Sequence, residues 1–535
     1  MTYLPVRTLS TCVLCVIFLA ACGGGGGSGS STPPLVVGWQ LGVFPPASTL
    51  AAKCAAPRVG VINPDTAKPY PDIVGTTLDE KNWLRSWSND FYLWYNEILD
   101  TDPATIAATA DYFKILKTMQ KTTTGADRDK FHFTYATKDW QALLSGSATA
   151  SYGPQWEFLS KPRTLPRQVV VVYSEPGAPA TAMGIARGAE VLFVDGVDLA
   201  NDNTQAGVAT LNAGLFPATA GESHAFQVRD VGTTTTHLVT LVSANFTTQP
   251  VQNVKVISNV AGSVGYMLFN DHLANSEAAL VSAFTQLQKA KVNDLVIDIR
   301  YNGGGLLDIA SEVAFMVAGS ARTSGQTFEL QQFNSKYPNT NPFKNSAIQA
   351  TPFYDHSIGF DKTLLAGGQP LPTLNLPRVF VLTGGSTCSA SEAIINGLNG
   401  VNVQVIQIGS TTCGKPYGFY AQDNCSVTYF SIEFRGVNAA NFGDYTDGFS
   451  AHNSVTPTNA TLPGCSVADD FTHALGDPAE GRLAAALNYA VAPGICPAPA
   501  PTGISKALLV QQASQAEAFA LAMPPTRQLR ILTRR

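Results

Sequence analysis

Hydrophobic positions first recur at helical spacing. From about residue 78, aromatic residues return every three or four positions, which marks one apolar face of a helix; they are Trp83, Trp87, Phe91, Trp94 and Tyr95. A second amphipathic stretch covers residues 106–119. We interpret the stripe as helix packing rather than as a ligand platform. It predicts a small helical domain over residues 78–147.

The spacing changes to that of strands over residues 148–247. Residues 168–173 form an apolar run, and residues 191–194 form another that ends in the hairpin-turn pair Asp195-Gly196. A segment with turn residues and a short helix joins the two runs. The pattern predicts a β domain.

Residues 262–495 alternate between strand and helix patterns. Strands are expected at 264–269, 294–299, 379–383 and 403–408, with helices at 276–290, 305–318 and 391–398. Such alternation favours a parallel sheet covered by helices. Residues 320–372 are expected to be long and irregular. The predicted fold class is therefore α/β and multidomain.

The N-terminus has the pattern of an export signal. Arg7 is the only charge before residue 22, and the apolar stretch 11–21 is too short to span a bilayer. It ends in Leu-Ala-Ala-Cys22, which resembles a bacterial lipobox. The resemblance implies a signal peptide over residues 1–21, a lipid on Cys22, and a tether and N-terminal segment over 22–77. The alternative is an ordinary signal peptide with an incidental Cys22.

If Cys22 is lipidated, the protein lies in the cell envelope. Gly23, rather than Asp, follows Cys22. In a Gram-negative bacterium this favours the outer membrane over the inner one, with the protein in an extracytoplasmic location. Gly and Ser then form a flexible tether. Residues 496–535 form a C-terminal tail that is rich in Pro and then helical or loose.

Composition excludes two classes of protein. The 535 residues include 34 Lys and Arg and 39 Asp and Glu, for a net charge of -5, and nucleic-acid binding requires a basic footprint instead. With 45% hydrophobic residues, the chain has enough apolar surface for real cores, so global disorder is excluded.

Six of the nine cysteines remain after export and lipidation. An even number in an oxidising compartment indicates disulfides; the six are Cys54, Cys388, Cys413, Cys425, Cys465 and Cys496. From proximity along the chain we expect Cys413 to pair with Cys425, and Cys465 with Cys496. No Cys-x-x-Cys or His-x-x-His spacing remains after export, so no zinc site is predicted. No other metal and no cofactor are expected.

The first segment with candidate chemistry follows a predicted strand. Residues 298–305 read Asp-Ile-Arg-Tyr-Asn-Gly-Gly-Gly. Glycines allow backbone N–H groups to approach a ligand closely. An oxyanion hole fits this loop better than a phosphate cradle, because the phosphate-loop spacings are absent. The alternative is a tight strand-to-helix turn.

The second segment contains a serine at the start of a helix. Ser389 and Glu392 have the spacing of a capping box, so Ser389 can be read simply as an N-cap. The same position also suits a nucleophile. There the N–H of Ala390 points toward the site, and the helix dipole favours a developing anion.

The third segment contains Lys415 in a turn between Gly414 and Pro416. A lone Lys in a turn is usually solvated. If Lys415 is desolvated beside a Ser hydroxyl, its pKa falls and the neutral amine can accept the Ser proton. The strand-helix-strand arrangement returns both segments to one edge of the sheet.

Together and in order, the three segments resemble the motifs D-L-R-x-N-x-G-G, S-A-S-E and T-x-G-K-G of the C-terminal-processing, or tail-specific, serine peptidases. The resemblance spans about residues 78–495. It implies Ser389 as the nucleophile and Lys415 as the general base. It also implies an oxyanion hole made by Ala390 with Gly303 or Gly304. Ser391 is an alternative nucleophile, and Cys388 is a less favoured alternative.

The family also implies a domain order of helical region, PDZ domain and a protease core similar to the ClpP and crotonase cores, here over residues 262–495. Residues 175–196 resemble the PDZ pattern S-P-A-x-x-A-G-I-x-x-G-D-x-I-x-x-V-D-G. PDZ domains bind peptide C-termini by strand addition. Residues 152–156 (Tyr-Gly-Pro-Gln-Trp) lie where the carboxylate loop belongs, and they depart from the usual Gly-Leu-Gly-Phe.

One departure concerns the residue that orients the lysine. Many family members have Gln four residues after the Lys, where this chain has Phe419. Related branches use a His as the base, and three histidines outside the motifs are available: His272, His356 and His452. Asp298, Arg300 and Glu392 are read as structural supports.

The resemblance predicts a lipid-anchored serine endopeptidase that cleaves exported or partly unfolded proteins with a Ser389/Lys415 dyad and PDZ-assisted capture. Its partners are then a protein or peptide substrate and a membrane. The first alternative is a catalytically inactive peptide-binding scaffold. The second is a carrier of a small apolar ligand. The sequence leaves the substrate and the oligomeric state open.

Overall fold

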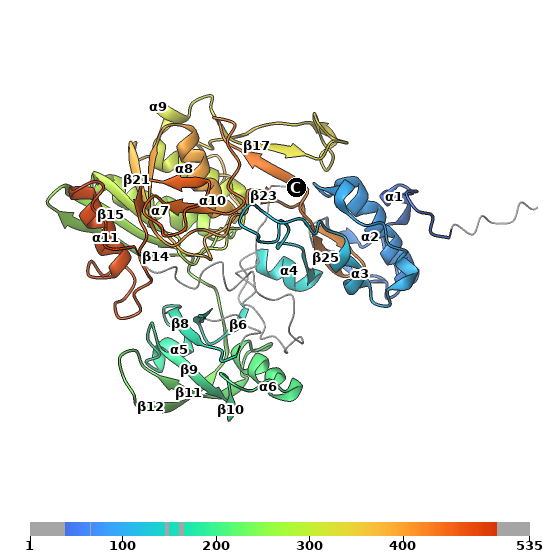
Figure 1. Cartoon of the computed structure of the whole chain (residues 1–535), viewed down its shortest axis with the longest axis horizontal. Helices are drawn as coiled ribbons and strands as arrows, with labels where there is room; N and C mark the ends of the chain where they lie inside the picture. The colour runs from blue at the N-terminus through green and yellow to red at the C-terminus, as the bar shows by residue number, and fades with distance from the viewer. Residues whose placement is uncertain (1–37, 65, 145–148, 160–164, 500–535) are drawn as a thin grey trace, which may run out of the picture. The chain divides into compact units, whose positions relative to one another are not determined.

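A six-stranded sheet organises the C-terminal half of the protein (Figure 1). The structure is a computed structural model that describes residues 38–64, 66–144, 149–159 and 165–499. In spatial order the strands are β14 (Val251–Asn259), β15 (Gly262–Phe269), β16 (Asp294–Asp298), β21 (Arg378–Thr383), β22 (Gln404–Gly409) and β29 (Gly464–Cys465). From β15 onward all neighbours are parallel, so their carboxyl ends meet at one edge.

Helices cover both faces of this sheet. Alternate residues of β21 face opposite layers, as the period of two requires. Val379 and Val381 pack into the cluster that contains α7 (Ser276–Lys289), α8 (Leu307–Ala318) and α10 (Ala390–Gly400). Phe380 and Leu382 pack with α11 (Gly481–Val491). The strands and helices predicted for this region are confirmed to within a few residues at their ends.

In the main sheet, β14 was not among the predicted strands, and a second sheet contains another long strand that we did not predict. It is β17 (Thr327–Phe333), which lies between β20 (Thr351–Pro352) and β26 (Phe434–Val437), and β26 also pairs with β23 (Tyr417–Gly418). Residues 320–372 are therefore not irregular throughout. The reason is that β17 buries polar side chains, Glu329 and Gln331 among them, which hides its alternation.

The N-terminal part begins with α1 (Ala47–Leu50) and α2 (Thr77–Phe91). A capping box of Thr76 and Asp79 starts α2, and its aromatic residues pack as predicted, with Trp83 stacked on Trp87. The next helix, α3 (Thr109–Ile115), is shorter than the predicted 106–119, since Leu116 leaves the helical conformation.

The predicted helical region also contains a strand. The strand is β5 (Phe133–Ala136). It forms a three-stranded antiparallel sheet in which β25 (Val427–Phe430) lies between β5 and β24 (Gln422–Asn424). The α4 helix (Thr137–Leu144) follows β5. Shorter elements of this part are β1 (Lys53–Cys54), β2 (Ile62–Asn63), β3 (Lys68–Pro69), β4 (Ile73–Val74), η1 (Tyr95–Glu97) and η2 (Pro103–Thr105).

The predicted β region forms an antiparallel sheet of its own. Its strands, in the order β12-β11-β9-β8-β7 with β10 beside β9, are β7 (Pro154–Phe158), β8 (Val169–Ser174), β9 (Glu190–Val194), β10 (Val197–Asp198), β11 (Ser223–Arg229) and β12 (Thr236–Val242). Asp195 and Gly196 have φ values of 50° and 79°, which confirms the predicted hairpin turn. Helices α5 (Pro179–Ala182) and α6 (Gln205–Leu215) accompany the sheet.

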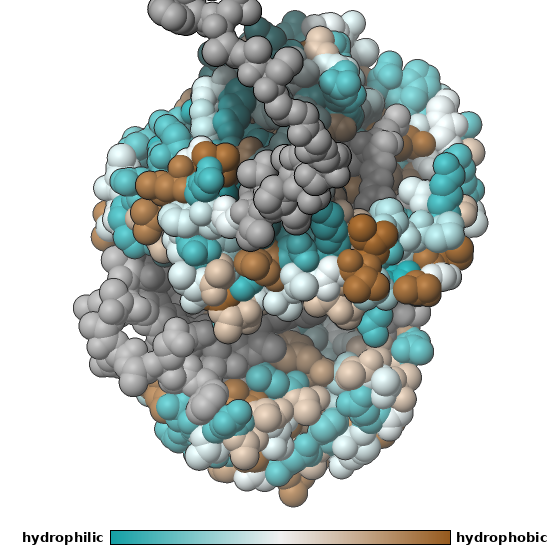
Figure 2. Space-filling view, turned by 90° about the vertical axis from the view of Figure 1, so that its right-hand side faces the viewer, coloured by the Kyte–Doolittle hydropathy of each residue, from teal (hydrophilic) through white to brown (hydrophobic). Residues whose placement is uncertain are grey.

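Smaller strands and helices complete the described chain. They are β6 (Thr149–Ser151), β13 (Ala244–Phe246), α9 (Ser320–Thr323), β18 (Thr340–Asn341), β19 (Ser346–Ala347), β27 (Phe449–Ala451) and β28 (Ala460–Leu462). Within the described residues, no helix has the length and apolar character to cross a membrane. The predicted signal peptide, Cys22 and most of the C-terminal tail lie outside the described residues. On the face in Figure 2, hydrophobic residues form small separate groups among hydrophilic ones.

Three disulfides connect the described cysteines. Cys465 pairs with Cys496, as predicted. The predicted Cys413–Cys425 pair is wrong, because Cys425 bonds to Cys54 and Cys413 bonds to Cys388. The loops after β21 and β22 start at the same sheet edge, which brings Cys388 and Cys413 together although 25 positions separate them.

Candidate active site

A pocket lies at the loops that follow β21 and β22. It contains both the predicted nucleophile, Ser389, and the predicted base, Lys415. The other lining residues are Gly305, Leu307, Glu329, Ala390, Ala393, Pro416, Tyr417, Gly418, Phe434 and Tyr445. Two of the three predicted motifs are therefore confirmed to meet at one place, and the third reaches it through Gly305.

Ser389 has a strained backbone directly before α10. Its φ is 55° and its ψ is -112°, a region that residues other than Gly rarely adopt. Strain of this kind costs about 1–3 kcal/mol and clusters at functional sites. The backbone N–H of Ser389 donates to Oε2 of Glu392 at 3.0 Å, so part of the predicted capping box is present.

Lys415 is buried, with 1% of its surface exposed. Its Nζ lies 3.4 Å from the ring centroid of Phe419 and 5.2 Å from that of Phe131. The reading of Lys415 as a solvated turn residue is therefore wrong. Phe419, four residues after Lys415, packs its ring against the amine.

Glu392 connects the serine segment to the lysine segment. In addition to Ser389 N, its carboxylate accepts the N–H groups of Gly414 and Lys415, both at 2.8 Å, and the hydroxyl of Thr412 at 2.5 Å. Burial raises the pKa of Glu392, and these donors oppose that shift. One buried carboxylate thus fixes the backbone positions of both candidate catalytic residues, which agrees with the predicted supporting role.

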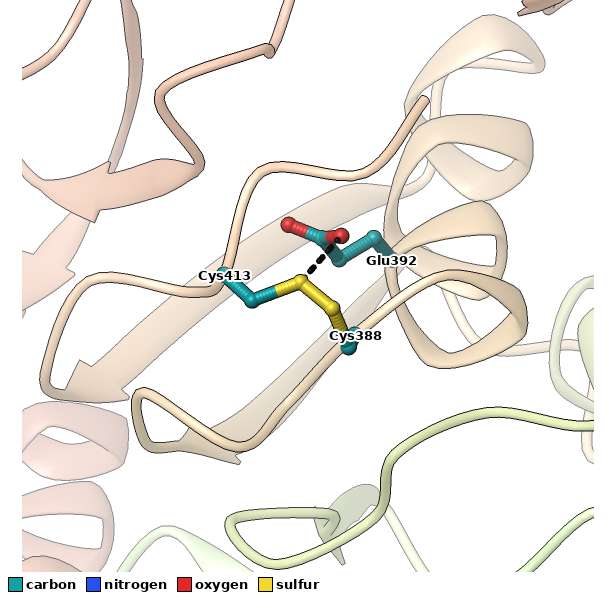
Figure 3. A group of neighbouring side chains, drawn as sticks. All are labelled: Cys388, Glu392 and Cys413. Atoms are coloured by element: carbon teal, nitrogen blue, oxygen red, sulfur yellow. Dashed lines mark hydrogen bonds between the residues drawn. A yellow bond between two sulfur atoms is a disulfide. The ribbon is translucent and has the colours of Figure 1, made fainter. Parts of the chain in front are cut away.

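A disulfide lies beside Glu392 (Figure 3). It joins Cys388, the residue before Ser389, to Cys413, two residues before Lys415. The Cys413 sulfur lies 3.5 Å from Oε2 of Glu392. The group of two cysteines and a carboxylate resembles a metal-ligand set in composition, but its sulfurs are bonded to each other. The disulfide also removes Cys388 as a rival nucleophile.

The glycine loop lies against the start of α10. Gly304 has a φ of 99°, and a β-carbon there would lie 2.8 Å from Cys388 O and 2.9 Å from Ala390 N. The Gly304 N–H donates to Oδ1 of Asn302 at 2.9 Å. In the described part of the chain, no acceptor is found for the N–H of Ala390, Gly303 or Gly305. Residues 303–305 and 390 are thus close to one another, with donors available.

The rival residues lie away from the reacting position. The Ser391 hydroxyl donates to the carbonyl of Asn302 at 3.1 Å and is buried. His272 is fully buried next to Phe269, and burial lowers its pKa to about 3. His356 is exposed beside Asp355, and His452 is exposed as well. None of these four side chains lines the pocket.

Asp298 and Arg300, which directly precede the glycine loop in the chain, belong to a buried charge cluster. The Arg300 guanidinium contacts Asp298, Asp469 and Glu480 at 2.6–2.9 Å. Buried arginine with several carboxylates is typical of structural support. The predicted supporting role of Asp298 and Arg300 agrees with these contacts.

Sequence reasoning missed Glu433, which lies between β25 and β26. Its Oε2 accepts the N–H of Tyr420 at 2.8 Å. Burial raises the pKa of Glu433 well above its usual range, and the nearby charge of Lys415 acts in the opposite direction. No local sequence signal identifies Glu433, because β26 brings it near the lysine only through sheet pairing.

Sequence comparison matches residues 263–418 to peptidase family S41. A carboxyl-terminal-processing protease of a Picosynechococcus species is 27% identical over 245 residues, which cover 46% of this chain and 50% of that protein. A chloroplastic C-terminal processing peptidase of Tetradesmus obliquus is 31% identical over 167 residues, covering 28% and 34%. The chain thus spans half or less of the length of these two curated relatives.

Structural comparison points to the same group of folds. A crystallised protein from Bacteroides fragilis, assigned to the S41 proteases, superimposes with a TM-score of 0.55 at 22% identity. The match covers 79% of this chain and 97% of that one. At this identity the likeness establishes the fold alone, a mixed α/β architecture around the site described above.

Proposed function

We propose that this chain, which carries a peptidase family S41 domain over residues 263–418, is a serine-type endopeptidase that hydrolyses protein or peptide substrates. The observation that carries the proposal is the joint placement of Ser389 and Lys415 in one pocket, tied to the same buried carboxylate of Glu392. Two similar proteins are named as C-terminal processing peptidases.

Lys415 acts as the general base in this proposal. Lys415 is almost fully removed from water, and desolvation disfavours the charged form of an amine. In this proposal the neutral amine accepts the proton of the Ser389 hydroxyl. Ser389 Oγ then attacks the substrate carbonyl carbon and forms the tetrahedral intermediate. A buried Glu433 that keeps its proton adds no negative charge beside Lys415, which preserves the neutral amine.

Backbone N–H groups stabilise the oxyanion. Ala390 supplies one donor from the start of α10, where the helix dipole favours negative charge. Gly303 is the better second donor among the two predicted glycines, because the N–H of Gly304 already donates to Asn302. Removal of one such donor from a serine peptidase typically costs a factor of about 10²–10³ in kcat.

The second half of the reaction returns the enzyme to its starting state. The intermediate collapses, the peptide C–N bond breaks, and protonated Lys415 gives its proton to the leaving amine. Water then attacks the acyl ester on Ser389, with the neutral amine of Lys415 again taking a proton. The products are a carboxylic acid and the free amine, and Ser389 regains its hydrogen.

Two further proposals concern the setting of this chemistry. The β domain at residues 148–247 serves as a PDZ-like module that delivers unfolded or C-terminal segments, on the support of its sequence pattern and its separate antiparallel sheet. The second proposal is that the signal peptide is cleaved after Ala21 and that Cys22 carries a lipid. This lipid anchors the enzyme in the cell envelope, at the bacterial outer membrane. Only the sequence supports this second proposal.

A cleavage assay tests the proposed function. Purified protein is incubated with unfolded casein beside Ser389→Ala, Lys415→Ala and Ser391→Ala variants. We expect cleavage by the wild type and by Ser391→Ala, and a loss of at least about 10³-fold in Ser389→Ala and Lys415→Ala. Circular dichroism verifies that each variant is folded. Cleavage that survives Ser389→Ala contradicts the assignment, and no cleavage by folded wild type favours the scaffold alternative.

A further inference from the structure

The pocket beside Ser389 contains an acidic side chain that has no role in the proposed hydrolysis mechanism. Glu329 projects from the middle of β17 and lines the same pocket as Ser389 and Lys415. A β-carbon on Gly436, in the neighbouring strand β26, would overlap the Glu329 carboxyl group. Glycine at position 436 therefore leaves the room that this carboxyl group occupies.

Glu329 has no polar partner in the part of the chain that the structure describes. No hydrogen bond or ion pair involves its carboxyl group there, and only 6% of the residue is exposed. Burial raises the pKa of Glu329 to about 8. A buried polar group without a partner is destabilising, so a ligand that satisfies this carboxyl group gains binding energy.

Three aromatic residues contribute to the same pocket. Tyr417, Phe434 and Tyr445 all line it. Aromatic faces attract organic cations, most strongly where water is excluded. A carboxylate combined with aromatic rings in one pocket is suited to an ammonium or guanidinium group. An apolar side chain would gain the ring contacts but leave the carboxyl group of Glu329 unsatisfied.

We propose that Glu329 makes this pocket selective for a basic side chain, Lys or Arg, on the substrate residue whose carbonyl Ser389 attacks. The inference rests on the proposed peptidase function and adds a substrate class to it. The pocket adjoins both Ser389 and the oxyanion donor Ala390, which is where the side chain of the attacked residue must lie. A bound cation also disfavours protonation of Lys415, in keeping with its role as a neutral base.

Matched peptides test this selectivity. Two peptides differ only at the attacked residue, Lys in one and norleucine in the other, so that the ammonium group is the chief difference. We expect the wild type to prefer the Lys peptide by at least about tenfold in kcat/KM, which is the range of a charged hydrogen bond. Glu329→Gln removes the preference by lowering kcat/KM for the Lys peptide while that for norleucine stays within about threefold.

Controls keep the test specific to the pocket. Glu312→Gln changes another buried carboxyl group that does not line the pocket, and it retains the preference for Lys. Glu329→Asp keeps the carboxyl group with a shorter reach and retains part of the preference. If Glu329→Gln does not fold, the comparison of the two peptides on the wild type still decides. Equal cleavage of both peptides overturns the inference.

A binding measurement separates this inference from the proposed function. Fluorescence anisotropy of labelled peptides on Ser389→Ala reports capture without cleavage. We expect tighter binding of the Lys peptide, at least about tenfold, and its loss in the double variant Ser389→Ala/Glu329→Gln. Preferential binding by a protein that cleaves neither peptide contradicts the peptidase function but supports the basic pocket. Cleavage without any preference supports the function and refutes the pocket.

Discussion

Glu392→Gln is the substitution that most directly perturbs the link between the serine and the lysine. In the native protein each carboxylate oxygen has two donors: Oε1 accepts from Gly414 and Thr412, and Oε2 accepts from Ser389 and Lys415. The amide of Gln keeps one acceptor oxygen and replaces the other with an NH₂ group. The two groups that donate to one of the Glu392 oxygens therefore face the NH₂ group of Gln, which donates instead of accepting.

The cost follows from this geometry. The least damaging orientation places the NH₂ toward Thr412, whose hydroxyl can accept, and leaves the N–H of Gly414 without an acceptor, at about 1–3 kcal/mol. The two remaining bonds lose their charge, at roughly 1 kcal/mol each. We therefore expect the free energy of unfolding to fall by about 3–5 kcal/mol. A displacement of Ser389 or Lys415 by about 1 Å costs on the order of 10² in rate, mainly in kcat.

Two assays check both quantities. Urea unfolding followed by tryptophan fluorescence gives the free energy, and cleavage of a fluorogenic peptide gives kcat and KM. Glu312→Gln is the matched control: burial and the nearby Glu277 raise the pKa of Glu312 to about 10, so at neutral pH its carboxyl group is already uncharged and the swap is nearly isosteric. Activity of Glu392→Gln within about threefold of wild type, with the control unchanged, would refute the reasoning.

Three other perturbations have defined outcomes. The double substitution Cys388→Ser/Cys413→Ser opens a loop of 25 residues, and urea unfolding should show a loss of about 3 kcal/mol; an unchanged midpoint contradicts this. Burial raises the pKa of Glu329 from 4.5 to about 8, so the folded protein holds this proton more tightly than the unfolded chain, and wild-type stability falls as the pH rises between these values. Between about pH 5 and about pH 9 the free energy of unfolding of the wild type should therefore change by on the order of 4 kcal/mol on account of Glu329, and Glu329→Gln should remove this change. The same pH dependence of the free energy of unfolding in wild type and variant argues against it. Gly304→Ala places a methyl group 2.8 Å from Cys388 O at a φ of 99°, so cleavage should drop by at least about tenfold, whereas Gly385→Ala, which meets no atom within 4 Å, should leave the rate nearly unchanged.

The meeting of the motifs was predictable because it depends on local order alone. Consecutive strands β21 and β22 run parallel and are joined by α10, so the loops after them must start at one sheet edge. The same reasoning predicts the Cys388–Cys413 pair, yet proximity along the chain suggested Cys413–Cys425. Cys425 lies in the turn between β24 and β25, on a separate sheet. Its actual partner is Cys54, 371 positions away in the sequence, and no local pattern indicates this disulfide.

The acids around the site could not be found in this way. Glu329 and Glu433 lie in or beside strands β17 and β26, which pair across more than 100 residues. Each lies between two apolar residues, Glu329 between Phe328 and Leu330 and Glu433 between Ile432 and Phe434. In a strand, a polar residue between apolar neighbours is expected on the opposite, solvent-facing side, so the local pattern predicts exposure rather than burial. Only the assembled sheet brings Glu329 into the pocket and Glu433 near Lys415. Long-range pairing, rather than local propensity, determines the residues that shape this site.

Covalent labelling tests the central claim most directly. A fluorophosphonate probe reacts with an activated serine hydroxyl, and mass spectrometry of the digested protein locates the modified residue. We predict a single modified serine, Ser389, with labelling that is lost in Ser389→Ala and slowed at least about 10²-fold in Lys415→Ala. Labelling at Ser391 or elsewhere, or labelling of Ser389 at the same rate without Lys415, would contradict the account.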